Sequence, residues 1–127
     1  MRKIVLALIA LLMVSGLLLT FFPDRWLAFQ WRRIFSLVHT WGGMFFLVAF
    51  SLYAWDHISG NRHWLRRVAW VTASGTVQAL SGALLILTGL VLFFYGVQAW
   101  RALRDIHLWL TFLLPASIIL HFLSKKS

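Results

Sequence analysis

The chain has 127 residues, of which 61% are hydrophobic, 17% aromatic and only 12% charged. This apolar share is far above that of ordinary soluble domains and predicts an integral membrane protein. The formal charge is +9, and the absence of cysteine excludes disulfides, thiolate metal sites and cysteine catalysis.

Four apolar stretches predict four membrane-spanning helices at about residues 4–22, 34–55, 68–97 and 106–123, each long enough to cross a bilayer. The expected fold is all-α, an integral membrane four-helix bundle forming a single domain over residues 1–127. The first stretch has the basic start and apolar body of a signal peptide. No small-residue cleavage site precedes Pro23, so we expect this stretch to be retained as a helix.

The charged residues lie outside or at the ends of the apolar stretches, where water or lipid headgroups can solvate them. Seven bases fall on the side of both termini (Arg2, Lys3, Arg62, Arg66, Arg67, Lys125, Lys126) and five on the other (Arg25, Arg32, Arg33, Arg101, Arg104). The excess of seven over five predicts cytoplasmic termini. Because tryptophans accompany these bases on both sides, we expect contact with lipid headgroups and no nucleic-acid partner.

The connections between the predicted helices are too short to hold a further domain. Aromatic and basic residues over 24–33 predict a segment lying along the membrane interface. Ser59, Gly60 and Asn61 are turn residues and predict the end of the second helix.

Histidine spacing is the most informative pattern in the chain. The second stretch carries His39 near its start and His57 near its end, and the fourth carries His107 and His121. At about 100° per residue, 14 positions from His107 return to within about 40° of the same helix face, and 18 positions from His39 return to nearly the same angle. Each helix therefore presents two imidazoles on one side.

The second and fourth helices are expected to run in the same direction, which predicts two cross-helix pairs. His39 would face His107 near the periplasmic side, and His57 would face His121 near the cytoplasmic side. Opposed imidazoles in a bundle are the arrangement that ligates haem iron on both axial sides. We therefore expect two non-covalent b haems, with a single haem or purely interfacial histidines as the alternatives.

The two spacings differ in length along the helix axis. Fourteen residues rise about 21 Å and eighteen about 27 Å, so the pairs align only if the second helix tilts or His57 lies beyond its last regular turn. His63 is then the alternative ligand to His57. The turn residues at 59–61 favour His57, because a helix continued to His63 would place that residue about 120° off the shared face.

Glycines form a stripe on the third predicted helix at intervals of seven: Gly75, Gly82, Gly89 and Gly96. Such a surface admits either a flat haem edge or a neighbouring helix backbone. Gly42 and Gly43 follow His39 by one helical turn, and they too could contact either a haem or a neighbouring helix.

Polar and helix-breaking residues near the histidines complete the candidate site. Arg33 and Arg104 are candidates for binding haem propionates. Asp105 could orient an imidazole or pair with a local arginine. Pro115, near the middle of the span from His107 to His121, predicts a kink that either adjusts the ligand directions or shapes the bundle.

The segments "LVHTWGGMFF", "YAWDH" and "RDIHLWLTFLLPASIILH" resemble the small bacterial four-helix di-haem cytochrome b family, over about residues 33–124. Relatives of that family include the cytochrome b subunits of formate dehydrogenases and nickel-iron hydrogenases. The chain departs from the pattern in the 18-residue spacing and in the absence of a histidine from the first helix. The resemblance implies a multi-pass protein of the bacterial inner membrane with axial ligands His39, His57, His107 and His121.

The expected function is that of a membrane electron-transfer subunit that relays electrons between a quinone pool and a redox partner. The expected partner is a multihaem cytochrome, an iron-sulfur protein or a hydrogenase-like enzyme. The alternative is a cofactor-free structural or assembly subunit, in which glycines serve only packing. Metal transport is disfavoured, because histidines about 21 Å apart along one helix cannot share an ion.

Overall fold

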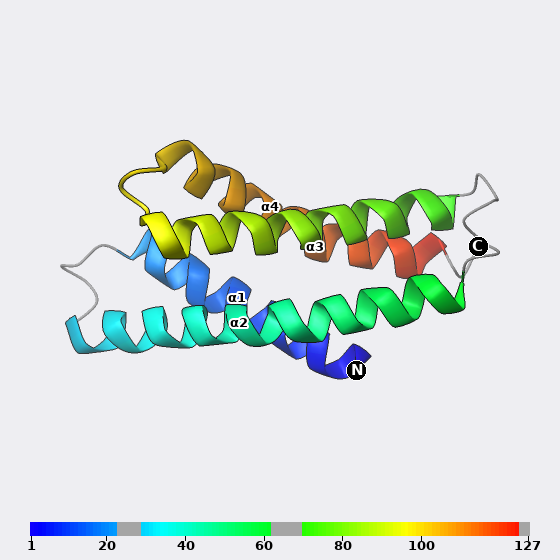
Figure 1. Cartoon of the computed structure of the whole chain (residues 1–127), viewed down its shortest axis with the longest axis horizontal. Coiled ribbons are helices and arrows are strands. Elements are labelled where there is room, and N and C mark those ends of the chain that lie inside the picture. The colour runs from blue at the N-terminus through cyan, green and yellow to red at the C-terminus, as the bar shows by residue number, and fades with distance from the viewer. Residues whose placement is uncertain (23–28, 62–69, 125–127) are drawn as a thin grey trace. The chain divides into compact units, whose positions relative to one another are not determined.

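The structure, a computed structural model, describes residues 1–22, 29–61 and 70–124. Within these residues the chain forms four α-helices and no strand, which confirms the predicted all-α class (Figure 1). The helices are α1 (Arg2–Phe21), α2 (Phe29–Gly60), α3 (Trp70–Tyr95) and α4 (Arg101–Ser124). All four are long and apolar enough to cross a membrane.

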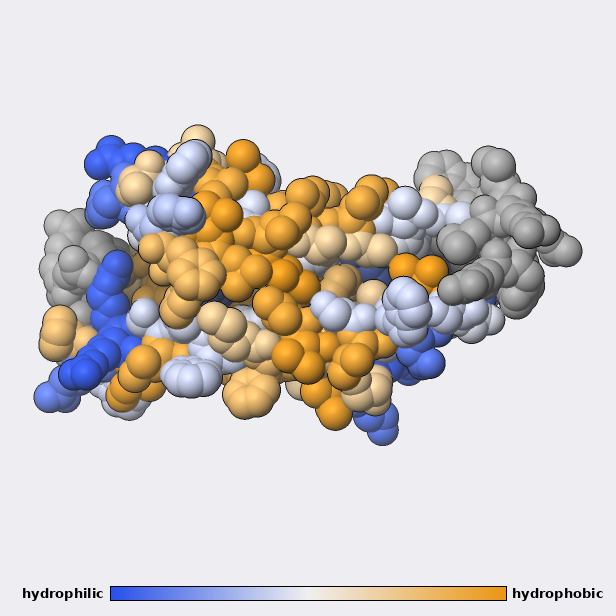
Figure 2. Space-filling model, in the orientation of Figure 1, coloured by the Kyte–Doolittle hydropathy of each residue, from blue (hydrophilic) through white to orange (hydrophobic). Residues whose placement is uncertain are grey.

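Large apolar side chains point outward along these helices. Trp41 is 63% exposed, Phe45 66%, Phe94 72% and Trp109 75%. Figure 2 shows the middle portions of the visible helices covered by hydrophobic residues, with hydrophilic residues near the helix ends. A soluble protein rarely exposes so much contiguous apolar surface. The helices are therefore compatible with a multi-pass membrane protein.

Helix boundaries extend beyond the apolar stretches in two places. α2 begins at Phe29 and ends at Gly60, and α4 begins at Arg101, whereas hydropathy predicted helices over 34–55 and 106–123. Residues 29–33, which were predicted to precede the second helix, form the first turns of α2. Residues 23–28 lie outside the described residues, and the position of this segment at the membrane interface stays a prediction. Arginine is a good helix former whose charged end can reach water from a helix, so the backbone continues past the apolar limit.

The chain divides within α2 into two compact units, Met1–Ser51 and Leu52–Ser127. The first contains α1 with most of α2, and the second contains the end of α2 with α3 and α4. Each unit is described by itself below. The prediction of one domain over residues 1–127 stays a prediction.

Small and aromatic residues hold α1 against α2 in the first unit. Gly42, Phe46 and Phe50 recur every four residues and are buried, which defines one face of α2. A side-chain carbon on Gly42 would lie 3.2 Å from Leu12 Cδ2, so the glycine allows close approach of the two helices. The rings of Phe46 and Phe50 stack at 5.0 Å.

α3 and α4 form an antiparallel helical hairpin and lie side by side in the second unit (Figure 1). Their contact surface contains Ser81 and Thr88 from α3 with Leu110, Leu114 and Ile118 from α4, all buried. α4 continues through Pro115, as its single range shows. The predicted proline kink stays a prediction.

Gly96 ends α3 in a left-handed conformation, with φ +79°. Its backbone N–H donates to the carbonyl of Leu92 at 3.0 Å and satisfies an acceptor left over at the helix end. Residues 97–100 form the turn before α4. Gly96, a member of the predicted stripe, thus has a backbone role of its own at this helix end.

Replacing Gly96 with alanine should lower the free energy of unfolding by about 1 kcal/mol, because a Cβ atom is unfavourable at positive φ. Thermal unfolding followed by far-UV circular dichroism in detergent measures the change. Gly60→Ala is the matched control, because Gly60 is helical and a Cβ there meets nothing within 4 Å. Equal stability of Gly96→Ala and the wild type would contradict the described helix end.

Candidate functional site

Three of the four predicted ligand histidines share the same kind of neighbour. In each, the ring atom Nδ1 lies within hydrogen-bond distance of a hydroxyl on an adjacent helix. The contacts are His39 with Ser15 at 3.0 Å, His121 with Ser74 at 3.0 Å, and His107 with Thr88 at 2.7 Å. All three are partly buried. The histidines are therefore fixed to neighbouring helices through Nδ1.

A glycine follows each of these hydroxyl residues in the sequence, and we call each such dipeptide a hydroxyl-glycine pair. A Cβ atom on the glycine would lie close to Cε1 of the histidine ring: 3.0 Å for Gly16 and His39, 3.5 Å for Gly75 and His121, and 3.4 Å for Gly89 and His107. The glycine thus leaves room for the edge of an imidazole at the surface of the helix.

Register explains why two such contacts form between α3 and α4. Ser74 and Thr88 are 14 residues apart, as are His107 and His121, and the helices are antiparallel. Because the spacing is the same on both helices, one alignment of α3 with α4 allows both hydroxyl–histidine contacts to form. At 1.5 Å per residue, the two contacts are separated by about 21 Å along the hairpin.

A third hydroxyl-glycine pair, Ser81 with Gly82, lies midway between the other two on α3. Both residues are buried, and the Ser81 hydroxyl donates to the carbonyl of Val77 at 2.6 Å. On α4, the residue midway between the two histidines is Leu114, which is 1% exposed. At the position halfway between the two histidines, α4 therefore has a buried leucine instead of a third imidazole.

His57 and His121, predicted as a pair, are brought together in the second unit. Their ring centroids are 6.3 Å apart, with 77° between the ring planes. His57 also stacks on Tyr53, one turn earlier on α2, at 5.7 Å. Two imidazoles bound to opposite sides of one metal ion, with bonds of about 2 Å, have ring centroids roughly 6 Å apart. The observed separation thus fits two axial ligands of one haem.

The other predicted histidines differ in what the structure describes. His39 belongs to the first unit and His107 to the second, so each is known with its own hydroxyl-glycine pair. Their assignment to one haem stays a prediction from the sequence. His63 lies outside the described residues.

The glycines proposed as haem contacts have several different neighbours. Gly75 and Gly89 face histidine rings, Gly42 faces Leu12, and Gly82 is buried in the hairpin. A Cβ atom at Gly43 would meet nothing within 4 Å. Helix packing therefore accounts for Gly42, and contact with a histidine ring accounts for Gly75 and Gly89. Contact of any of these glycines with a haem stays a prediction.

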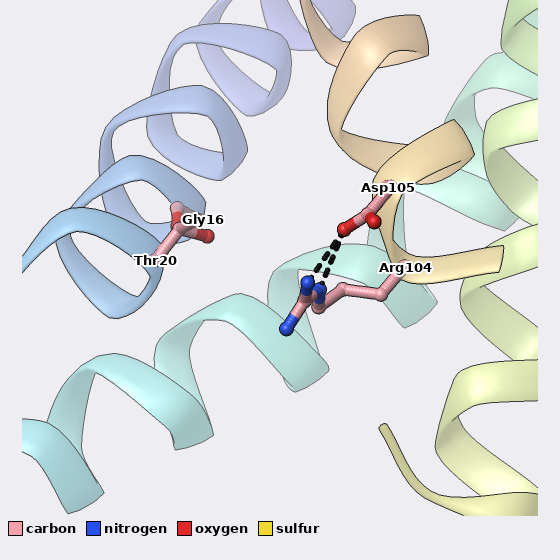
Figure 3. Close-up of polar contacts among 4 residues, drawn as sticks. All are labelled: Gly16, Thr20, Arg104 and Asp105. Atoms are coloured by element: carbon pink, nitrogen blue, oxygen red, sulfur yellow. Dashed lines mark hydrogen bonds and ion pairs between the residues drawn. The ribbon is translucent and has the colours of Figure 1, made fainter. Parts of the chain in front are cut away.

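Charged residues near the start of α4 form an ion pair. The Arg104 guanidinium donates two hydrogen bonds, at 2.7 and 2.8 Å, to one carboxylate oxygen of Asp105, as Figure 3 shows. The expectation that Asp105 pairs with a local arginine is confirmed. Both side chains are about half exposed. Arg33 is exposed on the first turns of α2, and the propionate-binding role of Arg33 and Arg104 stays a prediction.

Within residues 1–22, 29–61 and 70–124, no three histidine, aspartate or glutamate side chains gather in a group that could hold a metal ion. A haem would need only two ligands from the protein, and His57 with His121 offers that number.

The hydroxyl partners Ser15, Ser74 and Thr88 were not predicted from the sequence. The glycine stripe of α3 was predicted, but Gly16 and the hydroxyl residue before each glycine were not. The signal is nevertheless present, because Ser-Gly or Thr-Gly recurs at 15–16, 59–60, 74–75, 81–82 and 88–89, of which 59–60 lies at the end of α2. Through Ser15, α1 contributes to histidine binding although it carries no histidine.

Comparison of the chain with protein-family models, with curated proteins and with solved structures finds no match.

Substitution of Gly16 by alanine should move the imidazole of His39, because the new methyl group would lie 3.0 Å from Cε1. The Hε1–Cε1 correlation of His39 in an NMR spectrum of the micelle-bound protein reports this shift directly. Gly75→Ala is the control, since its methyl group would make an ordinary contact with His121 at 3.5 Å. An unmoved His39 signal in Gly16→Ala would contradict the contact of this ring with α1.

Proposed function

We propose that this protein is a membrane electron-transfer subunit carrying two b haems held by His39, His57, His107 and His121. The observation that carries the proposal is the pair formed by His57 and His121, with ring centroids 6.3 Å apart. In this pair, His121 is also held through Nδ1 by Ser74. The protein would pass electrons between a quinone pool and a redox partner.

The position of the histidines on apolar helices supports this function. Polar side chains in helices of this composition are costly in a bilayer and usually mark a functional site. His39, His107 and His121 are half-buried, and His57 is exposed near the end of α2. An imidazole held through Nδ1, as His121 is by Ser74, can present Nε2 to a metal ion, as metal-bound histidines commonly do.

Haem supplies one-electron chemistry at its iron when bound. The chain's own residues would hold it, fix the ring orientations and keep water away with apolar side chains. With two histidines of this chain holding each haem, the iron would have no position left for a substrate. Such binding would therefore favour electron transfer over oxygen chemistry.

The connection between α3 and α4 spans only residues 96–100, which is too short to hold a redox domain. We propose a multihaem cytochrome, an iron-sulfur protein or a hydrogenase-like enzyme as the partner that exchanges electrons with the haems. The proposed location is the bacterial inner membrane, with lipid around the helices and quinone as the diffusing carrier.

The purified protein should show a b-type reduced-minus-oxidised absorption spectrum with two haems per chain in a pyridine haemochrome assay. His57→Ala and His121→Ala should each remove the same haem, because both variants break one axial pair. His39→Ala and His107→Ala should remove the other. Haem per chain measured on each purified variant checks the assignment.

His63→Ala is the matched histidine control for His57→Ala. Loss of a haem in His63→Ala, with both haems kept in His57→Ala, would move the ligand assignment to His63. A colourless protein from haem-supplied cells would overturn the proposed function and favour the structural-subunit alternative.

Cysteine accessibility tests the proposed topology, and the natural chain is a clean background because it has no cysteine. A thiol at Asn61 should react with a membrane-impermeant maleimide only from the cytoplasmic side, and a thiol at Gln98 only from the periplasmic side. Both residues lie beyond helix ends, where water reaches them. Labelling of both from one side would contradict the predicted four spans.

A further inference from the structure

We infer that Ser15 and Thr88 are positioning residues that select one protonation form of the haem ligands His39 and His107. The inference rests on the proposed function, because it concerns ligation of the same haems. It goes beyond that function by assigning a role to two hydroxyls and to α1, which carries no ligand.

The direction of each hydrogen bond follows from where the hydroxyl proton goes. Ser15 donates to the carbonyl of Leu11 at 2.8 Å, one turn back on its own helix. Thr88 donates to the carbonyl of Leu84 at 2.7 Å in the same way. A hydroxyl has one proton and two acceptor lone pairs. With the proton directed to the backbone, the oxygen faces the histidine as an acceptor.

Only one neutral form of the imidazole satisfies this arrangement. When Nδ1 carries the proton, it donates to the hydroxyl oxygen and both hydrogen bonds form together. When Nε2 carries the proton, the hydroxyl must turn away from its backbone acceptor to serve Nδ1, and one bond is lost. Lost hydrogen bonds are costly in apolar surroundings. The neighbouring helix thus places the proton on Nδ1 and the lone pair on Nε2.

This arrangement prepares Nε2 for iron. Metal-bound histidines depend on an acceptor at the other ring nitrogen, which fixes the ring orientation and raises the basicity of the ligating atom. The adjacent glycine keeps the ring close to the helix, as the contact of His107 Cε1 with the Gly89 position shows. The hydroxyl-glycine pairs at 15–16 and 88–89 therefore each set both the proton and the position of one ligand.

Ser81 provides an internal control within the same helix. It is buried, precedes a glycine and donates to Val77 and Gln78 of its own helix at 2.6 and 3.2 Å. These are the bonds that the structure gives its hydroxyl, and neither goes to a histidine. Ser81→Ala therefore removes a comparable hydroxyl from α3 without removing a ligand's acceptor.

The first test reads the proton position without haem. Full-length protein with ¹⁵N-labelled histidine, purified without haem in detergent, should show His39 and His107 protonated at Nδ1. Thr88→Val keeps the side-chain shape and removes the acceptor, so His107 alone should lose this preference. Thr88→Ser should restore it, and Ser81→Ala should leave both unchanged. An Nε2-protonated His107 in the wild type would overturn the inference.

The second test uses the haem-loaded protein. Thr88→Val should weaken haem binding roughly 10- to 100-fold and raise the midpoint potential of one haem, because a less basic ligand stabilises oxidised iron less. Thr88→Ser should recover both values. Unchanged potential and affinity in Thr88→Val would overturn the positioning role while leaving the haems in place. A wild-type protein that takes up no haem would instead overturn the proposed function, and its spectrum reveals this before any variant is compared.

Discussion

A hydrogen bond between a helix hydroxyl and an imidazole is the interaction on which the arrangement of the histidines depends. An imidazole among apolar side chains carries a donor and an acceptor that both need partners. Ser15 provides the partner at Nδ1 of His39, and Thr88 provides it at Nδ1 of His107. Because each partner lies on another helix, satisfying the ring also fixes the distance and register of two helices. Packing and site geometry thus have one physical cause.

Small residues make these bonds possible. Lipid tails are as apolar as leucine, so helices in a bilayer associate through close packing and polar contacts instead of apolar burial. Glycine beside each hydroxyl allows the imidazole to approach, and Gly42 allows Leu12 to do the same in the first unit. Ser81 of α3 and Leu114 of α4, halfway between the two histidine contacts, are both buried. The same surface therefore serves both packing and ligand positioning.

Hydropathy and histidine spacing predicted the four helices and the approach of His57 to His121. These features depend on long apolar runs and on helix periodicity, which are visible in one sequence. The partners of the histidines were not predicted, because serine and threonine are common in apolar helices and only their register against the next helix distinguishes them. The start of α2 was also missed, since hydropathy measures the apolar span and Phe29–Arg33 continue the helix with arginines.

The connection at residues 96–100 gives the hairpin of α3 and α4 a natural order of closure. Thr88 and His107 are 19 residues apart along the chain, whereas Ser74 and His121 are 47 residues apart. The entropy lost in joining two points of a chain grows with the length of the loop between them. The contact nearer the turn therefore forms at the lower cost, and once made it aligns the remaining residues for the farther one. Closure of the hairpin is thus favoured from the Gly96 end, which would order His107 before His121.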